Sequence, residues 1–283
     1  MNSPAPPAIT AGMRIDALLR QPPLAALEMR LLLGHALGLS RVQLITQSER
    51  TLTAAEAAAL GALLQRRLAG EPVAYLLGTR EFFGLAFEVT PAVLIPRPET
   101  ELLVELALQR AAHGARVLDM GTGSGAIAVA LAQARPDLRV SALDASAAAL
   151  AVARRNAARH QAGVRFLQGD WYGALAHGER FDVIVANPPY IVAGDAHLAQ
   201  GDLRFEPIDA LTDHADGLSA LSTIIAGAGA HLHTGGWLLM EHGYDQAPAV
   251  RARIAAAGLA EAQSWLDLAG IERVSGGLRD KAE

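Results

Sequence analysis

The stretch RVLDMGTGSG, residues 116–125, joins a short apolar run to a loop that contains three glycines. Residues 116–120 are expected to form a buried strand and residues 126–134 a helix, so the glycines lie at a strand-to-helix turn. Glycines at such a turn let a ligand approach the backbone closely, and the first N–H groups of the helix can face an anion. The loop therefore predicts a site for a nucleoside-containing cofactor.

Alternating strands and helices follow this loop along the chain. Strands are expected at residues 139–143, 164–167, 181–186 and 237–241, and helices from the second strand to about residue 159 and over 217–232. This alternation predicts an α/β fold with a parallel sheet and helices on both faces. Asp144 ends the second strand about 20 residues after the loop, where an acid can accept both ribose hydroxyl groups. The loop and Asp144 alone do not distinguish a nicotinamide cofactor from S-adenosylmethionine.

The strand over residues 181–186 ends in the motif Asn187-Pro188-Pro189-Tyr190. Ligands of open parallel sheets bind beyond the carboxyl ends of the strands, so this motif is expected near the glycine loop. A planar amide or amine nitrogen is a weak nucleophile, because its lone pair is delocalised and has to be aimed at the methyl group. The Asn187 side-chain oxygen and the rigidly held Pro188 carbonyl can orient such a nitrogen, and Tyr190 can pack flat against it. The motif favours methyl transfer from S-adenosylmethionine, with a Pro-Pro turn that merely ends a strand as the structural alternative.

The N-terminal third of the chain has a different pattern. Residues 8–83 are expected to be helical, with capping boxes at Ser40/Gln43 and Thr53/Glu56 and no catalytic constellation. Residues 85–96 alternate around a turn at Thr90-Pro91, which predicts a β-hairpin, and a helix is expected to begin near residue 98. We therefore expect a helical domain over residues 1–83, a hairpin and linker helix over 84–112, and a catalytic domain over 113–283.

The composition excludes several classes of protein. The 283 residues include no cysteine, which excludes disulfide bonds, thiolate metal sites and cysteine nucleophiles. Residues 1–83 carry eight arginines and six acidic residues, whereas the rest carries sixteen basic and twenty-three acidic residues, the reverse of a nucleic-acid-binding surface. The start, MNSPAPP, lacks the pattern of a signal peptide, and no apolar stretch reaches the roughly 18 residues of a membrane span. We expect a soluble, cytoplasmic monomer without a metal.

Further segments show a resemblance to a known family. The chain resembles the protein-(glutamine-N5) methyltransferases that modify class-1 peptide chain release factors, and the resemblance covers nearly its whole length. It is carried by GEPVAY (70–75), FFGL (82–85), LIPRPETE (94–101), the glycine loop, DW (170–171), NPPY (187–190), RFEP (204–207) and EHG (241–243). The segment IPRPETE is the most specific of these, since the related methyltransferases of a ribosomal protein differ there.

The resemblance implies a fold, a reaction and a set of site residues. The fold is a seven-stranded S-adenosylmethionine-dependent methyltransferase (Rossmann-like) domain with a small N-terminal helical bundle that helps to hold the release factor. The reaction is methylation of the glutamine side-chain amide in the Gly-Gly-Gln motif. The residues implied for the cofactor are Gly121, Thr122, Gly123, Ser124, Gly125, Asp144, Trp171 and Asn187. Those implied for the glutamine are Asn187, Pro188, Pro189 and Tyr190, with Asn187, Pro188 and Tyr190 as catalytic residues.

Other functions are kept as alternatives. A glutamine methyltransferase of a ribosomal protein ranks second, and an adenine or guanine amino methyltransferase of nucleic acid is disfavoured by the acidic catalytic part. A protein that binds the cofactor and docks on release factors without turnover is the alternative outside enzymes. Arg97 and Glu99 are expected either to contact the substrate peptide or to hold the linker helix. The loop 191–210 is typical of a lid or binding loop, and Glu206-Pro207 is a candidate seat for the release factor.

Overall fold

The chain divides into two compact units, Met1–Gly78 and Thr79–Glu283. The computed structural model describes residues 8–280. The division falls at residue 78 and not at 83, because the strand that begins at Thr79 pairs within the second unit. The first seven residues, which bear on the expectation that there is no signal peptide, and the last three lie outside the described part. Within residues 8–280 no helix is both long and apolar enough to cross a lipid bilayer.

The first unit is a small helical bundle, as the leucine spacing predicts. Its helices are α1 (Ile15–Arg20), α2 (Ala26–Leu37), α3 (Arg41–Thr46), α4 (Ala54–Leu68) and α5 (Val73–Leu77). Both capping boxes are confirmed, at the starts of α3 and α4. The helices share one buried apolar core that includes Met29, Leu32 and Leu60.

The β-hairpin exists, but its predicted position is wrong. It consists of β1 (Thr79–Phe82) and β2 (Leu85–Glu88), which pair antiparallel around a turn at Phe83-Gly84. Phe83 and Gly84 both have positive φ, 51° and 74°, the conformation that two-residue hairpin turns require. The alternating residues 85–89 are thus mostly the second strand, and the segment after Pro91 is a loop whose Val93 and Ile95 are buried.

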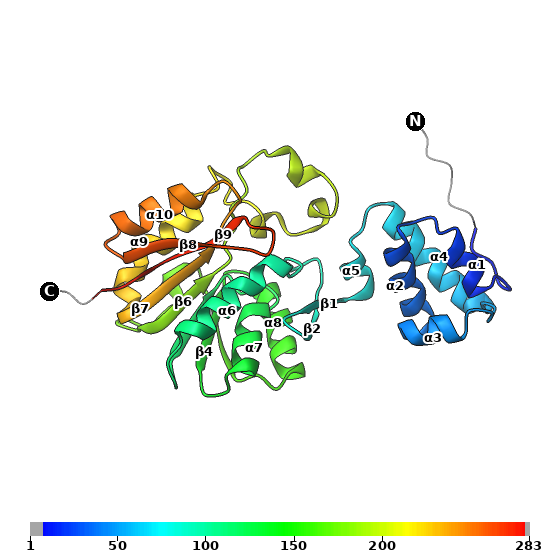
Figure 1. Ribbon diagram of the computed structural model, residues 1–283, viewed down its shortest axis with the longest axis horizontal. Helices are drawn as coiled ribbons and strands as arrows, with labels where there is room; N and C mark the ends of the chain where they lie inside the picture. Colours follow the sequence, from blue (N-terminus) through cyan, green and yellow to red (C-terminus); the bar gives the residue numbers. More distant parts are fainter. Residues whose placement is uncertain (1–7, 281–283) are drawn as a thin grey trace. The chain divides into compact units, whose positions relative to one another are not determined.

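The second unit contains a seven-stranded sheet, which confirms the implied fold (Figure 1). The strand order is β5-β4-β3-β6-β7-β9-β8, with β9 antiparallel to both neighbours. The strands are β3 (Arg116–Met120), β4 (Arg139–Asp144), β5 (Val164–Gln168), β6 (Phe181–Ala186), β7 (Leu232–Glu241), β8 (Ala260–Leu266) and β9 (Glu272–Leu278). The helices are α6 (Glu101–Arg110), α7 (Ala126–Ala134), α8 (Ala147–Arg159), α9 (Ser219–His231) and α10 (Ala247–Ala256).

Two apolar cores lie on the two faces of this sheet. Val117 faces the core that holds α6 and α7, whereas its neighbour Leu118 faces the core that holds α9 and α10. Both residues are fully buried, as expected for a parallel strand covered on both sides. Figure 1 shows the two groups of helices on opposite faces of the sheet.

The register of the parallel strands brings distant residues to one edge. Met120 of β3 pairs with Leu143 of β4 and with Ala186 of β6, and Ala186 pairs in turn with Met240 of β7. The residues that follow these partners therefore stand side by side at the carboxyl ends of the strands. They are Gly121, Asp144, Asn187 and Glu241.

Asn156 of α8 connects the hairpin to the glycine loop. Its side chain is fully buried; Oδ1 accepts a hydrogen bond from Glu88 N at 2.7 Å, and Nδ2 donates to Glu88 O at 3.0 Å and to Ser124 O at 2.8 Å. Buried backbone groups that lose their partners destabilise a fold strongly. Asn156 therefore fixes the loop after β3 against β2.

Replacing this residue should destabilise the second unit. Asn156→Ala leaves one buried and two partly buried backbone groups without this partner, and we expect the free energy of unfolding to fall by about 3 kcal/mol. Urea unfolding followed by tryptophan fluorescence measures this unit alone, since Trp171, Trp237 and Trp265 all lie in it. Arg155→Ala is the matched control: it breaks an exposed ion pair with Glu88 between the same two elements and should cost less than about 1 kcal/mol. Equal effects of the two variants would contradict the role of Asn156.

Candidate active site

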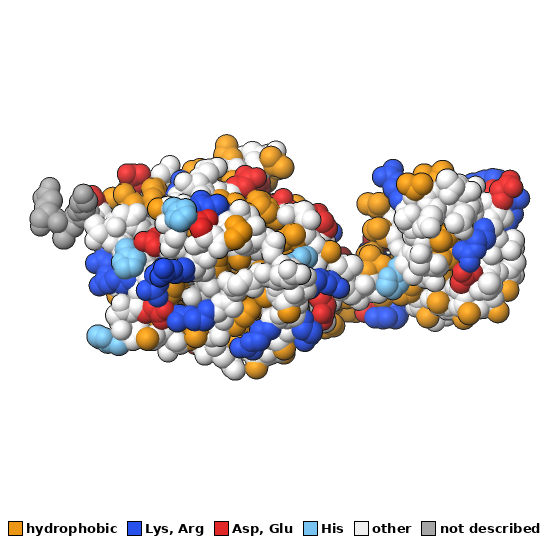
Figure 2. Space-filling model, turned by 90° about the horizontal axis from the view of Figure 1, so that it is seen from below, with side chains coloured by type: hydrophobic (Ala, Val, Ile, Leu, Met, Phe, Trp, Pro, Cys, Tyr) orange, Lys and Arg blue, Asp and Glu red, His pale blue; other side chains and the backbone are white. Residues whose placement is uncertain are grey.

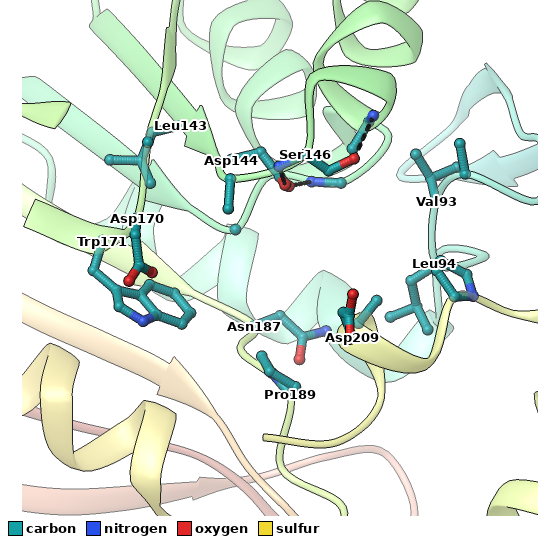
Figure 3. Close-up of a pocket in the computed structure, with 18 residues that line it drawn as sticks. Val93, Leu94, Leu143, Asp144, Ser146, Asp170, Trp171, Asn187, Pro189 and Asp209 are labelled. Atoms are coloured by element: carbon teal, nitrogen blue, oxygen red, sulfur yellow. Dashed lines mark hydrogen bonds between the residues drawn. The ribbon is translucent and has the colours of Figure 1, made fainter. Parts of the chain in front are cut away.

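A cavity of about 460 Å³ lies at the carboxyl edge of the sheet, within the range of small-molecule sites. Figure 3 shows its lining residues. Five of the predicted site residues for the cofactor line it: Gly121, Gly123, Asp144, Trp171 and Asn187. Pro189 also lines it, whereas Thr122, Ser124, Gly125, Pro188 and Tyr190 are not among the lining residues. The sequence therefore identified residues from four separate segments that the fold brings to one cavity.

Asp144 holds the glycine loop in place. Its Oδ2 accepts a hydrogen bond from Gly123 N at 2.9 Å, and its Oδ1 accepts one from Ser146 N at 2.9 Å. Burial raises the pKa of the Asp144 carboxyl above its usual range, and the two N–H donors oppose that shift. The carboxylate keeps further lone pairs on the cavity side, which can accept hydroxyl groups of a ligand.

The remaining residues of the glycine loop lie behind the cavity wall. Gly125 has a φ of 82°, and a Cβ there would come within 3.1 Å of Ala153 Cβ, so α8 packs directly on the loop. Thr122 Oγ1 donates to Asp119 Oδ2 at 2.6 Å. Burial raises the pKa of Asp119 to about 7, and its Oδ1 is buried without a hydrogen-bond partner in the described structure. These residues shape the loop, and their direct contact with a cofactor stays a prediction.

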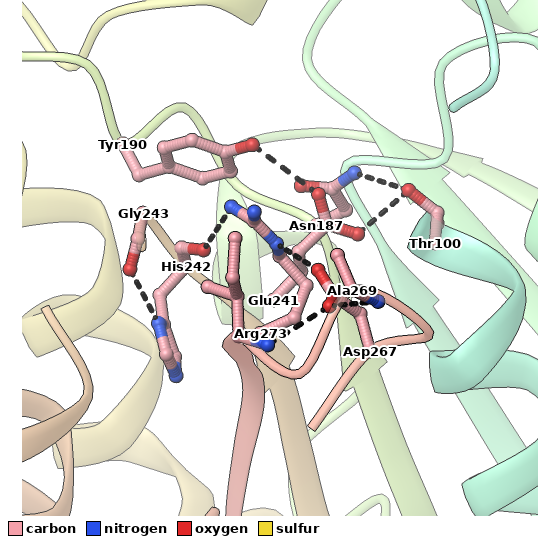
Figure 4. A network of polar contacts seen from close by, with 10 residues as sticks. Thr100, Asn187, Tyr190, Glu241, His242, Gly243, Asp267, Ala269 and Arg273 are labelled. Atoms are coloured by element: carbon pink, nitrogen blue, oxygen red, sulfur yellow. Dashed lines mark hydrogen bonds and ion pairs between the residues drawn. The ribbon is translucent and has the colours of Figure 1, made fainter. Parts of the chain in front are cut away.

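A hydrogen-bond network extends from Asn187 into the protein (Figure 4). Asn187 Nδ2 donates to Thr100 Oγ1 at 3.2 Å, and Thr100 Oγ1 donates to Glu241 Oε2 at 2.6 Å. Tyr190 OH donates to Glu241 Oε1 at 3.3 Å. Burial is the main cause that raises the pKa of Glu241 to about 7, and burial also raises the pKa of Tyr190. Asn187 and Tyr190 are therefore connected through a buried carboxyl group.

Arg97 and Glu206 form an ion pair between the IPRPETE segment and the loop 191–210. The Glu206 side chain is fully buried and also accepts a hydrogen bond from Ile95 N at 3.0 Å. Of the two alternatives for Arg97, this contact favours the structural one. The adjacent Pro207 and Asp209 line the cavity, so the ion pair holds part of the cavity wall.

The charge of the cavity discriminates between the two cofactors. Asp144, Asp170 and Asp209 line it, and no lysine or arginine of the described residues does. A dinucleotide would bring a pyrophosphate with two negative charges to this wall, whereas S-adenosylmethionine brings a sulfonium and an ammonium group. The residues present therefore fit S-adenosylmethionine. In the described part of the chain no group of three or more His, Asp or Glu residues could hold a metal ion.

Sequence reasoning missed part of this site. It assigned no role to Thr100 or Glu241, although both lie in segments that carry the resemblance, and it did not place Val93, Leu94 or Asp170 on the cavity. The sequence did contain one indication that Glu241 has a role. It is an acidic residue at the end of an apolar run that is expected to be a buried strand. A charged residue at such a place usually has a specific partner.

The sheet, the glycine loop with Asp144 and the acidic cavity beside NPPY define an S-adenosylmethionine-dependent methyltransferase. A family model described as the Methyltransferase small domain matches residues 98–202, and another described as the PrmC N-terminal domain matches residues 14–78. A methyltransferase from Pyrococcus furiosus has the same fold: its crystal structure superposes with a TM-score of 0.55, covering 77% of this chain and 98% of that chain at 20% identity.

Two curated relatives establish the family. The release factor glutamine methyltransferase of Burkholderia pseudomallei (strain K96243) is 59% identical over 98% of this chain and 99% of its own length. That of Bordetella pertussis (strain Tohama I) is 58% identical over 92% of this chain and 97% of its own length. The chain therefore belongs to the release factor glutamine methyltransferase family, and the resemblance found in the sequence is confirmed.

Removal of Arg97 should loosen the loop 191–210. In Arg97→Ala the buried carboxylate of Glu206 loses its charged partner, so we expect hydrogen–deuterium exchange in this loop to become about tenfold faster or more. Asp195→Ala, which removes an exposed contact to His197 in the same loop, is the matched control and should change exchange only locally. Unchanged exchange around residues 203–210 in Arg97→Ala would show that the ion pair does not hold the loop.

Proposed function

We propose that this chain methylates the side-chain amide nitrogen of the glutamine in the Gly-Gly-Gln motif of class-1 peptide chain release factors, with S-adenosylmethionine as methyl donor. The observation that carries the proposal is the pair of unused acceptors next to the cavity. Among residues 8–280, neither Asn187 Oδ1 nor the Pro188 carbonyl oxygen accepts a hydrogen bond. The names of the curated relatives support a release factor as the substrate.

Two acceptors on adjacent residues match a primary amide. The glutamine side chain has two N–H donors on one nitrogen, and two fixed acceptors can bind both. These two hydrogen bonds would orient the amide so that the lone pair of its nitrogen points at the methyl carbon, in line with the leaving sulfur. We propose Asn187 and Pro188 for this role, with Pro189 and Tyr190 framing the amide plane.

The cofactor would lie along the other side of the cavity. When bound, S-adenosylmethionine supplies a methyl group on a sulfonium sulfur and leaves as S-adenosylhomocysteine. Asp144 would accept the ribose hydroxyl groups, Trp171 would contact the adenine, and Gly121 and Gly123 would let the backbone approach. The nitrogen would form its new bond to the methyl carbon as the carbon–sulfur bond breaks, and its proton would then leave for solvent. No strong base is needed, because the N-protonated amide is a strong acid.

The mass of a release-factor peptide tests this function. Incubation of the protein with S-adenosylmethionine and a class-1 release factor should add one methyl group to the tryptic peptide that contains Gly-Gly-Gln. Asn187→Ala should lower kcat by about 10²-fold or more, because it removes a polar group that positions the reacting nitrogen. The dissociation constant for S-adenosylmethionine should change much less.

Two controls separate this function from its alternatives. Labelled S-adenosylmethionine is offered in parallel with release factor, with ribosomal proteins and with RNA. Label in RNA or in a ribosomal protein, with none in the release factor, would overturn the proposal. Unchanged turnover in Asn187→Ala would remove Asn187 from the mechanism even if the release factor is methylated.

We propose the N-terminal helical unit as a recognition domain for the release factor. A groove of about 330 Å³ between α2, α3 and α5 is lined by apolar side chains with Arg30, His35 and Arg41 among them. Leu27 and Leu31 of this groove are 67% and 43% exposed, a large apolar surface for a helix of a small domain. Figure 2 shows hydrophobic side chains exposed beside basic ones on this unit.

Polar substitution in this groove should weaken substrate binding. The double variant Leu27→Ser/Leu31→Ser is expected to raise KM for intact release factor about tenfold, the equivalent of about 1.4 kcal/mol. A short Gly-Gly-Gln peptide should show the same KM with the variant and the parent protein. Leu68→Ser, on α4 outside the groove and 45% exposed, is the matched control and should leave both values unchanged. If the double variant keeps the parent KM for release factor, the groove is not the recognition surface.

A further inference from the structure

Glu241 is a buried acid that has no cationic hydrogen-bond partner among residues 8–280. It ends β7 and is 1% exposed, and its side chain accepts hydrogen bonds from two hydroxyl groups, those of Thr100 and Tyr190. Arg273 influences it through space, but the guanidinium of Arg273 pairs with Asp267 at 3.3 Å. A buried carboxyl group destabilises a fold unless its interactions compensate. A buried acid at this edge of the sheet is therefore expected to have a role beyond stabilising the fold.

The carboxylate fixes the direction of every hydrogen bond in this network. An ionised carboxylate only accepts hydrogen bonds, so the Thr100 hydroxyl has to direct its single proton to Glu241. Thr100 Oγ1 can then only accept from Asn187, which turns the Asn187 amino group toward Thr100. The Asn187 oxygen is thereby left for another partner. Since the two ends of an asparagine amide have nearly the same shape, the hydrogen bonds and not the packing decide its orientation.

We propose that Glu241 is a positioning residue, which acts through Thr100 to present Asn187 Oδ1, and not Nδ2, to the substrate amide. This inference rests on the proposed function, because it explains how the acceptor that binds the glutamine N–H is kept in place. With the opposite orientation, the Asn187 amino group would face the N–H groups of the substrate. Two donors would then face each other, and no hydrogen bond would form. The network in Figure 4 contains the contacts from which this direction follows.

The isosteric variant Glu241→Gln tests the direction directly. A glutamine can donate to Thr100, whose proton then turns toward Asn187 and favours the flipped amide. We expect kcat to fall by about 10²-fold or more, as for loss of a reacting-group acceptor, while the dissociation constant for S-adenosylmethionine stays within about twofold. Thr100→Val, which removes the connecting hydroxyl, should lower kcat about tenfold. Thr100→Ser, which keeps the hydroxyl, should retain the kcat of the parent protein. The double variant Thr100→Val/Glu241→Gln should lose no more of kcat than Glu241→Gln alone, because both changes act on one chain of hydrogen bonds.

A spectroscopic readout is independent of turnover. The protein has three asparagines, so ¹⁵N-asparagine labelling gives three side-chain amide groups, and Asn187→Ala identifies that of Asn187. In the parent protein one of its protons should be protected from exchange by the bond to Thr100. In Glu241→Gln and Thr100→Val we expect this proton to shift and to exchange faster. An unchanged signal together with an unchanged kcat in Glu241→Gln would overturn the inference.

The pH profile adds a second signature. Burial and the nearby Glu99 raise the pKa of Glu241, while Thr100, Tyr190 and Arg273 lower it, and the result is about 7. The carboxyl group is therefore protonated below this pH and can then donate to Thr100. We expect kcat of the parent protein to rise as the pH increases through about 7, and kcat of Glu241→Gln to lack this rise. A rise of the same size in both would contradict the role of Glu241.

The outcomes separate this inference from the proposed function. If the parent protein methylates the release factor and Glu241→Gln does so equally well, the positioning role fails and the function stands. If the parent protein methylates no release factor, the function fails, and the asparagine spectrum still decides the direction of the network. Should Glu241→Gln not fold, the pair Thr100→Val and Thr100→Ser gives the same decision, with loss and recovery of kcat expected.

Discussion

The site depends on one constraint: four parallel strands end at the same level of the sheet. β4, β3, β6 and β7 are covered by apolar cores on both faces, and neighbouring apolar residues of a strand, such as Val117 and Leu118, face different cores. A slip of one residue in register would turn every buried side chain to the wrong face. The packing of the cores therefore fixes Gly121, Asp144, Asn187 and Glu241 next to one another. The precision of the site comes from the hydrophobic pattern of the strands and not from the polar residues themselves.

This edge also concentrates negative charge. Burial raises the pKa of Asp119, Asp144 and Glu241, which means that their ionised forms destabilise the folded state at neutral pH. A cationic ligand lowers such a pKa and offsets part of this cost, so a sulfonium cofactor and the acids near the cavity stabilise each other. Each of these acids also accepts hydrogen bonds from the protein: Asp119 from the Thr122 hydroxyl, Asp144 from two backbone N–H groups and Glu241 from two hydroxyl groups. Of the three, Asp144 alone lines the cavity, where a cationic ligand can reach it.

The sequence predicted the strands near the site well, because their apolar runs end at a glycine loop, at NPPY or at an acidic residue. It placed the hairpin wrongly, since Phe83-Gly84 does not match the usual turn pairs and Thr90-Pro91 does. It did not locate β8, whose exposed positions interrupt the apolar pattern, or β9, whose sequence ERVSGGL contains few apolar residues although its central positions are buried. The hydrogen bond between Thr100 and Glu241 could not be predicted either. Their contact joins residues 141 positions apart, and no local pattern specifies a contact of that kind.

The position of Glu241 explains how a carboxylate can serve methyl transfer without opposing it. A sulfonium loses its positive charge as the methyl group departs, so an anion beside the sulfur would stabilise the starting state more than the transition state. The groups proposed to bind the nitrogen, an amide oxygen and a peptide carbonyl, are neutral. The charge of Glu241 lies behind Thr100, where it sets the direction of the hydrogen bonds that end at Asn187. Separating the charge from the acceptor lets the protein fix the acceptor firmly while the groups that hold the nitrogen stay neutral.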